Sequence, residues 1–207
     1  MSDPTVKSTA ALYSNKAPPV RGGRGFSLIE LMVVVALLAV LAGIGIPNLQ
    51  SFLIRSRLTA AVNEVNAHLQ FARSEAIRRN LPVTVRRNAG AAGNWSEGWN
   101  TFLDTNGNGT QDVGDELLRA GRAFTEPMTL RAGTTIPDRL TFDGTGRLTT
   151  AGGVFVICHG TDLVSGSESR SRALLVSPTG RVRMALDSNG DGIPEKEGAA
   201  VASCTNP

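Results

Sequence analysis

The sequence contains little of what an enzyme needs. Histidine and cysteine each occur only twice, and aromatic residues make up 5% of the chain. No phosphate-binding loop or metalloprotease motif is present, and the serine, histidine and aspartate residues are scattered along the chain. These absences argue against an enzyme, and we expect neither a cofactor nor a metal.

Excess basic charge is confined to the beginning of the chain. The formal net charge is +3, and the first 25 residues hold four basic residues against one acidic residue: Lys7, Lys16, Arg21 and Arg24 against Asp3. Beyond residue 25, basic and acidic residues are equal in number. An anion-binding site must therefore rest on a local cluster of cations rather than on global charge.

One long apolar segment dominates the hydropathy pattern. Residues 31–46 carry no polar side chain, and no later segment is comparable. As a helix, residues 26–46 would extend about 31 Å, enough to cross the hydrocarbon core of a bilayer. Gly25 lies before this segment, whereas an ordinary secretory signal is cut after its apolar region. Cleavage at Gly25 would leave the helix on the mature protein.

Residues 25–32, GFSLIELM, resemble the GFTLIELMVV signature of type IV pilins and type II secretion pseudopilins. The resemblance implies that a prepilin peptidase cuts between Gly25 and Phe26 and methylates the new amino terminus. It also implies that Glu30 pairs with the amino terminus of a neighbouring subunit, since a carboxylate in an apolar run is costly without a partner. A solvated position at the membrane surface is the alternative for Glu30.

Pro47 removes a backbone donor and favours a kink. In pilins similar to this chain, the proline at this position allows the helix to loosen during assembly; an ordinary kink outside the membrane fits equally well. The resemblance further implies a single-pass protein of the inner membrane, with its C-terminal domain in the periplasm until it is assembled into a pilus or pseudopilus.

After Pro47 the apolar period becomes amphipathic. One stripe with spacings of four and three is formed by Leu58, Val62, Val65, Leu69, Ala72 and Ala76. One helix is therefore expected from about 26 to 79, ending at Leu81-Pro82. His68 lies off this stripe and is interpreted as a surface or boundary residue. We expect a cleaved leader at 1–25, a membrane and filament-core half at 26–53, an amphipathic half at 54–80 and a β-rich head at 81–207.

Beyond Pro82 the apolar period approaches two, and turn residues separate the segments. Strands are expected at 82–87, 98–103, 116–122, 127–131, 139–142, 153–158, 172–177 and 180–186. Antiparallel hairpins packed on the second half of the helix give an α+β fold.

The order of these segments carries a second resemblance. The runs WSEGWNTFLD (95–104), GDELL (114–118), LTFDGTG (140–146), VFVIC (154–158) and SPTGR (177–181) resemble the GspH/FimT family. That family holds the minor pseudopilin H of type II secretion and the minor pilin T of type IV pili, so the filament type stays open. Trp95, Trp99 and Phe102 could form a binding platform, but core packing is favoured because two of them lie within an expected strand.

Residues 180–183, GRVR, are the most suggestive binding motif. In a strand Arg181 and Arg183 point to one face, and Gly180 permits a tight turn before them. Arg170 and Arg172 precede a neighbouring strand and could add charge nearby. The motif resembles the GRxR motif of the minor pilin T branch, which is associated with uptake of double-stranded DNA in transformation. A solvated strand face, or pairing with Asp187 and Asp191, is the alternative.

Two polar loops resemble calcium loops. Residues 104–115 place oxygen donors at positions 1, 3, 5, 9 and 12, but between strands and without the final glutamate. The second loop offers Asp187, Asn189 and Asp191, yet its twelfth position is Gly198. A hairpin turn and a polar loop are the favoured interpretations, which leaves these residues as weak calcium candidates.

Cys158 and Cys204 are expected to form a disulfide, since two thiols in an exported chain without a C-x-x-C pair favour a bridge over a metal site.

Two functions follow. The first is a minor pilin that binds DNA through the GRVR motif during natural transformation, and the second is pseudopilin H of a type II secretion system. Expected partners are the prepilin peptidase, other pilins or pseudopilins, the inner membrane and DNA. An anchored periplasmic enzyme is disfavoured, because the chain has no catalytic set.

Overall fold

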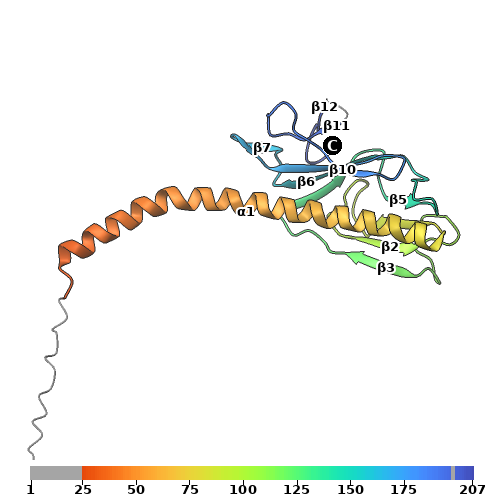
Figure 1. The fold of residues 1–207 in the computed structure, drawn as a ribbon, viewed down its shortest axis with the longest axis horizontal. Coiled ribbons are helices and arrows are strands. Elements are labelled where there is room, and N and C mark those ends of the chain that lie inside the picture. Colours follow the sequence, from red (N-terminus) through yellow and green to blue (C-terminus); the bar gives the residue numbers. More distant parts are fainter. Residues whose placement is uncertain (1–24, 197–198) are drawn as a thin grey trace, which may run out of the picture. The chain divides into compact units, whose positions relative to one another are not determined.

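The computed structural model describes residues 25–196 and 199–207 (Figure 1). The expected leader, apart from Gly25, lies outside the described residues. One long helix, α1 (Leu28–Arg79), is followed by strands, and the chain divides into two compact units between Ile44 and Gly45. The expected α+β fold, a long N-terminal helix with antiparallel sheets, is confirmed.

In the first unit α1 begins at a serine cap. Glu30 N donates a 3.2 Å hydrogen bond to Ser27 Oγ, so the serine side chain satisfies a free amide of the first turn. The apolar side chains that follow are exposed, among them Leu31, Val35 and Leu38. The segment is long and apolar enough to cross a membrane. α1 is helical through Pro47, so the proline does not end it.

In the second unit α1 buries the expected stripe, Leu58, Val62, Val65, Leu69, Ala72 and Ala76. The helix ends in a Schellman motif: Asn80 has a φ of 53°, its amide bonds to Ile77 O, and Leu81 N bonds to Ala76 O. Pro82 then prevents the helix from continuing.

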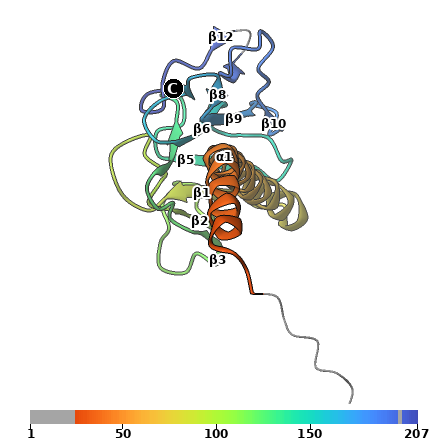
Figure 2. The ribbon, with the colours of Figure 1, turned by 90° about the vertical axis from the view of Figure 1, so that its left-hand side faces the viewer.

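Two four-stranded antiparallel sheets pack with the helix. The first has the order β3 (Leu117–Gly121), β2 (Trp99–Leu103), β1 (Val83–Arg87), β5 (Arg139–Phe142). The second has the order β10 (Val182–Met184), β9 (Ser171–Val176), β6 (Gly153–His159), β4 (Met128–Ala132). β6, β9 and β10 lie above the part of α1 that belongs to the second unit, and β3 lies below that part (Figure 1, Figure 2).

Two short hairpins complete the fold: β7 (Val164–Ser165) with β8 (Glu168–Ser169), and β11 (Glu195–Lys196) with β12 (Ala199–Ala200). The sequence does not predict these strands, because two residues are too few to show a period. The eight longer strands lie where the sequence predicts them.

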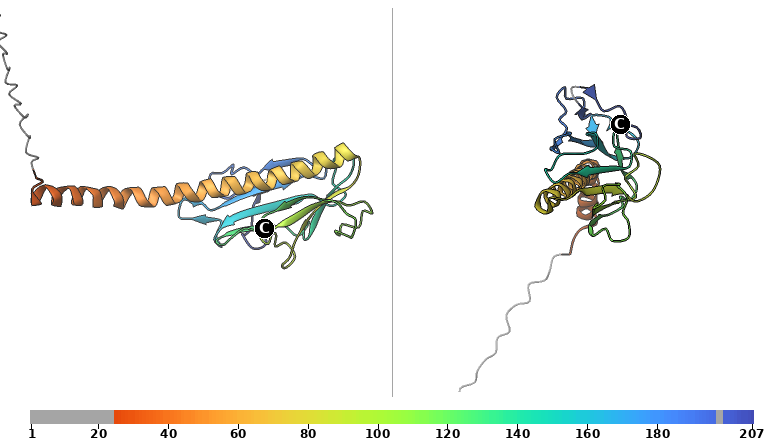
Figure 3. Two further views of the ribbon diagram at one scale, coloured as in Figure 1. Left: turned by 90° about the horizontal axis from the view of Figure 1, so that it is seen from below. Right: turned by 90° about the vertical axis from the view of Figure 1, so that its right-hand side faces the viewer.

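β6, an inner strand of the second sheet, is buried on both faces, and this explains its apolar run. Phe155 and Ile157 pack in the cluster shared with α1, whereas Val154, Val156 and Cys158 pack in a second cluster with the C-terminal residues Val201 and Cys204. The view from below shows the strands running alongside the C-terminal, yellow part of α1 (Figure 3).

Trp95, Trp99 and Phe102 are core residues, each at most 1% exposed, so they form no binding platform. His68 corrects the sequence interpretation, because it is only 3% exposed and its ring meets the edge of Trp99 at 5.2 Å between centroids. The buried face of α1 is wider than the six-residue stripe: Ala61 and His68 form a second row beside it, at helical spacing.

Candidate functional site

The N-terminal candidates lie at the start of α1. Gly25, Phe26 and Glu30 are exposed, and Glu30 occupies the first helical turn. Phe26 lies two residues before α1, so a carboxylate lies four residues along the chain from the residue that cleavage after Gly25 would make the first. Exposure of Gly25 is what a protease would require, and the carboxylate is the only acidic side chain of the apolar segment.

Gly180 lies in a tight turn between β9 and β10. Its φ is 76°, its amide bonds to Ser177 O at 2.8 Å, and Ser177 N in turn bonds to Arg181 O at 2.9 Å. A Cβ added at Gly180 would lie 2.0 Å from Gly146 O. Both the backbone angle and the close approach therefore require glycine here.

Arg181 and Arg183 are among the residues that line a hollow of about 660 Å³. Val182, between them, packs against the cluster shared with α1, whereas Arg183 lies opposite Leu175 in the register, on the other face of the sheet. Both guanidinium groups belong to exposed residues. The other lining residues include Thr135, Thr179 and, unexpectedly, Lys196.

None of these three cations forms an ion pair with a carboxylate among the described residues. The alternative partners are engaged by their own loop: Asp187 accepts bonds from Gly190 N and Gly192 N, and Asp191 from Asn189 Nδ2 and Ile193 N. The hollow thus gathers positive charge that the described carboxylates do not neutralise.

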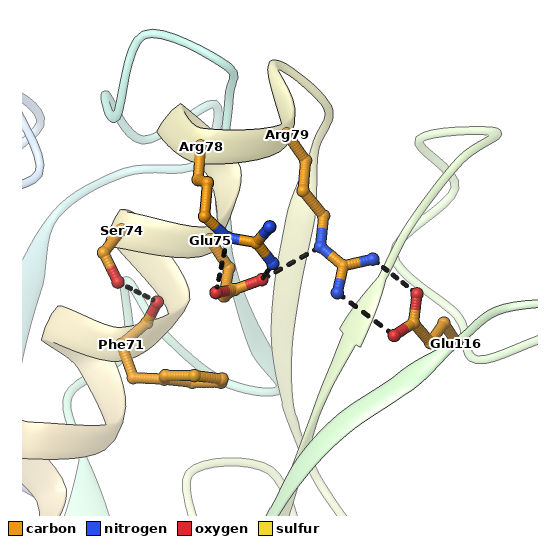
Figure 4. Close-up of polar contacts among 6 residues, drawn as sticks. All are labelled: Phe71, Ser74, Glu75, Arg78, Arg79 and Glu116. Carbon is orange, nitrogen blue, oxygen red and sulfur yellow. Dashed lines mark hydrogen bonds and ion pairs between the residues drawn. The ribbon is translucent and has the colours of Figure 1, made fainter.

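Two arginines elsewhere on the head, unlike those of the hollow, are paired with carboxylates. Arg79, at the end of α1, bonds to both Glu75 and Glu116, and Arg78 also bonds to Glu75 (Figure 4). The Arg78 hydrogen bond is the main cause that holds the pKa of the Glu75 carboxyl below its usual value, and Arg79 does the same for Glu116. These cations tie the helix end to the segment before β3 and leave little free charge.

Arg170 and Arg172 do not line the hollow. Arg172 Nη1 donates to Ser169 Oγ and to Ser171 O, and Arg170 pairs with Glu168 at 3.8 Å. The physical reason is distance along the strand. Arg170 precedes β9 and Arg172 lies opposite Ile157 of β6, whereas the hollow lies at the other end of β9, where Val176 is opposite Gly153. The expected addition of their charge to the GRVR site is therefore absent from the hollow.

Lys196 reaches the hollow through the C-terminal segment. Cys158 in β6 and Cys204 form a disulfide with their Cα atoms 5.9 Å apart. Val201 and Cys204 are buried in the second cluster, which also holds Leu175 of the hollow. No local motif marks Lys196; only the expected disulfide indicated that this segment returns to the second sheet.

The two polar loops are organised by their own hydrogen bonds. Asp104 is buried, and its Oδ2 accepts bonds from Thr84 Oγ1 and Gly109 N, while Asp112 accepts from Asn106 and Asn108. Among the described residues no three His, Cys, Asp or Glu side chains are grouped to hold a metal ion. Gly198 lies outside them, so calcium at Asp187, Asn189 and Asp191 stays a prediction.

Two family comparisons match the chain. The family described as type II transport protein GspH matches residues 61–180, and the prokaryotic N-terminal methylation motif matches residues 21–46. The first match covers most of the helix packed on the head and the strands up to Gly180, so Arg181, Arg183 and Lys196 lie beyond it.

The similar solved structures and curated relatives are also pilins or pilin-like proteins. The crystal structure of the type IV minor pilin FimU from Pseudomonas aeruginosa is similar with a TM-score of 0.53 and 25% identity, over 74% of this chain and 98% of that one. A Pseudomonas aeruginosa fimbrial protein is 48% identical over 48 residues, which are 23% of this chain and 31% of the relative. The pilin-like protein PilA1 of Thermus thermophilus is 36% identical over 94 residues, 45% of this chain and 56% of the relative. The chain thus spans about a third to a half of the length of these curated relatives.

Proposed function

Because the chain belongs to the type II transport protein GspH family, we propose that it is a minor pilin whose Arg181 and Arg183 bind DNA during natural transformation. It is a pilin-like structural subunit and not an enzyme. The observation that carries the DNA proposal is the hollow beside β10, where two guanidinium groups lie without carboxylate partners among the described residues.

Each segment of the chain has its own role in processing, anchoring or assembly. A prepilin peptidase removes residues 1–25 after Gly25, and Phe26 becomes the methylated first residue. Residues 26–53 anchor the subunit in the inner membrane and later lie in the filament core, where Glu30 faces the amino terminus of a neighbouring pilin and Pro47 lets the helix loosen. Residues 54–80 hold the head, 81–207, which lies in the periplasm. The methylation motif and the apolar helix support this arrangement.

The chemistry of the hollow suits a phosphodiester backbone. Guanidinium groups donate forked hydrogen bonds to phosphate oxygens, and the hydroxyls of Thr135 and Thr179 offer further donors beside them. Among the described residues, no aromatic side chain lines the hollow, so stacking with unpaired bases is not supported and duplex DNA is the favoured ligand. Contacts of this kind carry no base information, so binding is sequence-independent, weak and sensitive to salt.

A gel-shift experiment with duplex DNA tests the proposal. The full chain in a neutral detergent is compared with Arg181→Gln/Arg183→Gln and with Arg119→Gln. Arg119 is exposed and lies in β3 of the other sheet, so this variant removes one positive charge away from the hollow. The double variant should bind up to about 30-fold more weakly, since each of the two exposed contacts contributes up to about 1 kcal/mol. Equal affinity of all three proteins would exclude the hollow as the DNA site.

The second candidate is a pseudopilin of a type II secretion system, and the GspH family match favours it. Both functions use the same leader, anchor and fold. Deleting the protein separates them: a pseudopilin is required for release of folded exoproteins, whereas a minor pilin is required for pili and for uptake of DNA.

A further inference from the structure

We infer that Lys196 is a third phosphate-binding residue of the hollow and that the Cys158–Cys204 disulfide holds it there. The inference rests on the proposed DNA function and extends it to a segment beyond the GRVR motif. It joins three cations from two separate parts of the chain, Arg181 and Arg183 at β10 and Lys196 in the β11–β12 hairpin.

The position of Lys196 is the first observation. It lines the hollow together with Arg181 and Arg183, it is half-buried, and it forms no ion pair with a described carboxylate. Three like charges around one concavity repel each other, and an anion bound among them relieves that repulsion. A flexible ammonium group adds a point charge that needs no fixed geometry, beside two guanidinium groups that give directional bonds.

The anchoring of Lys196 is the second observation. Glu195 N bonds to Leu186 O at 2.9 Å, just after β10, and Lys196 pairs with Ala199 across the short hairpin. Val201 N then bonds to Pro194 O at 3.0 Å. These few main-chain bonds would hold a two-residue hairpin only weakly by themselves.

The disulfide supplies the stronger constraint. Cys204 is buried in the same cluster as Val201, and its bond to Cys158 fixes the C-terminal segment to β6, an inner strand of the second sheet. The same cluster contains Leu175, which lines the hollow and lies opposite Arg183 in the register. The bond that fixes the segment thus limits how far Lys196 can move away from the two arginines.

The first test measures DNA affinity against salt for the wild-type chain, Lys196→Gln, Lys196→Arg and Arg119→Gln. Loss of one phosphate contact should lower the slope of log affinity against log salt by about 0.9. Raising salt from about 50 to about 200 mM should therefore weaken the wild type about 3.5-fold more than Lys196→Gln. Lys196→Arg should keep the wild-type slope. A slope for Lys196→Gln equal to that of the wild type would overturn the inference.

The second test asks whether the disulfide acts through Lys196. Dithiothreitol treatment of the wild type should reduce the salt slope towards that of Lys196→Gln, whereas Lys196→Gln itself should show no further loss. Circular dichroism confirms that the reduced head stays folded, and Cys158→Ala/Cys204→Ala repeats the comparison without reductant. Equal losses in the wild type and in Lys196→Gln would show that the disulfide does not position Lys196.

Different results would reject the DNA-binding function and the role of Lys196 in it. Wild-type binding that depends on Arg181 and Arg183 but not on Lys196 would leave the DNA function in place and reject the third contact. Binding that is indifferent to all three residues would reject the DNA function, and the inference with it.

Discussion

Arg73 of α1 donates a 3.0 Å hydrogen bond from Nε to the main-chain oxygen of Gly146. The same oxygen is the atom that a side chain at Gly180 would strike. The helix thus bonds to the turn that contains Gly146. That turn packs closely against the turn at Gly180, which directly precedes Arg181. These contacts place the turn that leads to the candidate DNA-binding arginines against the part of the head that packs on α1.

Gly180→Ala should destabilise the head more than Gly107→Ala. Both glycines have a positive φ, 76° and 70°, so both variants incur the left-handed strain of about 1–2 kcal/mol. Only the methyl group at 180 meets another atom, whereas nothing lies within 4 Å at 107. The clash should add about 1–3 kcal/mol to the loss in the free energy of unfolding. Urea unfolding followed by the fluorescence of the buried Trp95 and Trp99 measures both, and equal losses would contradict the packing of the two turns.

Removal of the disulfide should lower the free energy of unfolding by about 2–4 kcal/mol, since the bond closes a loop across 46 residues. The measurement is urea unfolding of Cys158→Ala/Cys204→Ala, and mass spectrometry of the wild type should find the two cysteines linked. Free thiols in protein purified from the periplasm would refute the bridge.

His68 should make the stability of the head fall in mild acid. Burial is the main cause that lowers the pKa of His68, and the charge of Arg119 lowers it further while Glu64 opposes them. Because the unfolded chain then binds the proton more readily, stability is full above pH 6.5 and is lost as the pH falls below it.

His68→Gln should flatten this dependence between about pH 7.5 and about pH 5, a range that lies above the ordinary carboxyl pKa values. His159→Gln is the comparison. Burial also lowers the pKa of His159, but this residue is less buried than His68, so its replacement should flatten the pH dependence less. An unchanged slope in His68→Gln would show that this ring does not titrate with unfolding.

Glu30→Ala should impair incorporation into filaments and leave insertion into the membrane intact. The reason is that the variant removes the charge proposed to pair with a neighbouring amino terminus, while it makes the apolar segment more apolar. Gln50→Ala, an exposed polar position of the same helix, serves as the control. Immunoblots of sheared filaments and of membranes measure the two pools, and normal assembly of Glu30→Ala would exclude the charge pair.

The sequence predicts the elements well where period and turn residues agree. The stripe from Leu58 to Ala76 and the continuous apolar run of β6 leave few alternatives, and every long strand appears where expected. His68 is missed because the buried face of α1 is wider than one stripe, and the width depends on what packs against it.

The site is harder to read from the sequence than the fold. Arg170 and Arg172 are near the GRVR motif in the chain, yet they lie at the start of β9, whereas the hollow lies beside the end of that strand, at Leu175 and Val176. Lys196 joins the hollow through a two-residue hairpin and a disulfide, which no local pattern encodes. Contacts made by tertiary structure alone decide which cations share the surface.

Transformation of living cells tests the central claim most directly. The organism that encodes the chain should carry Arg181→Gln/Arg183→Gln, or Arg119→Gln as the control, in place of the natural gene. We expect the double variant to assemble filaments in normal number and to take up DNA far less often than the wild type, while Arg119→Gln behaves as the wild type does. Normal transformation by the double variant would contradict the account.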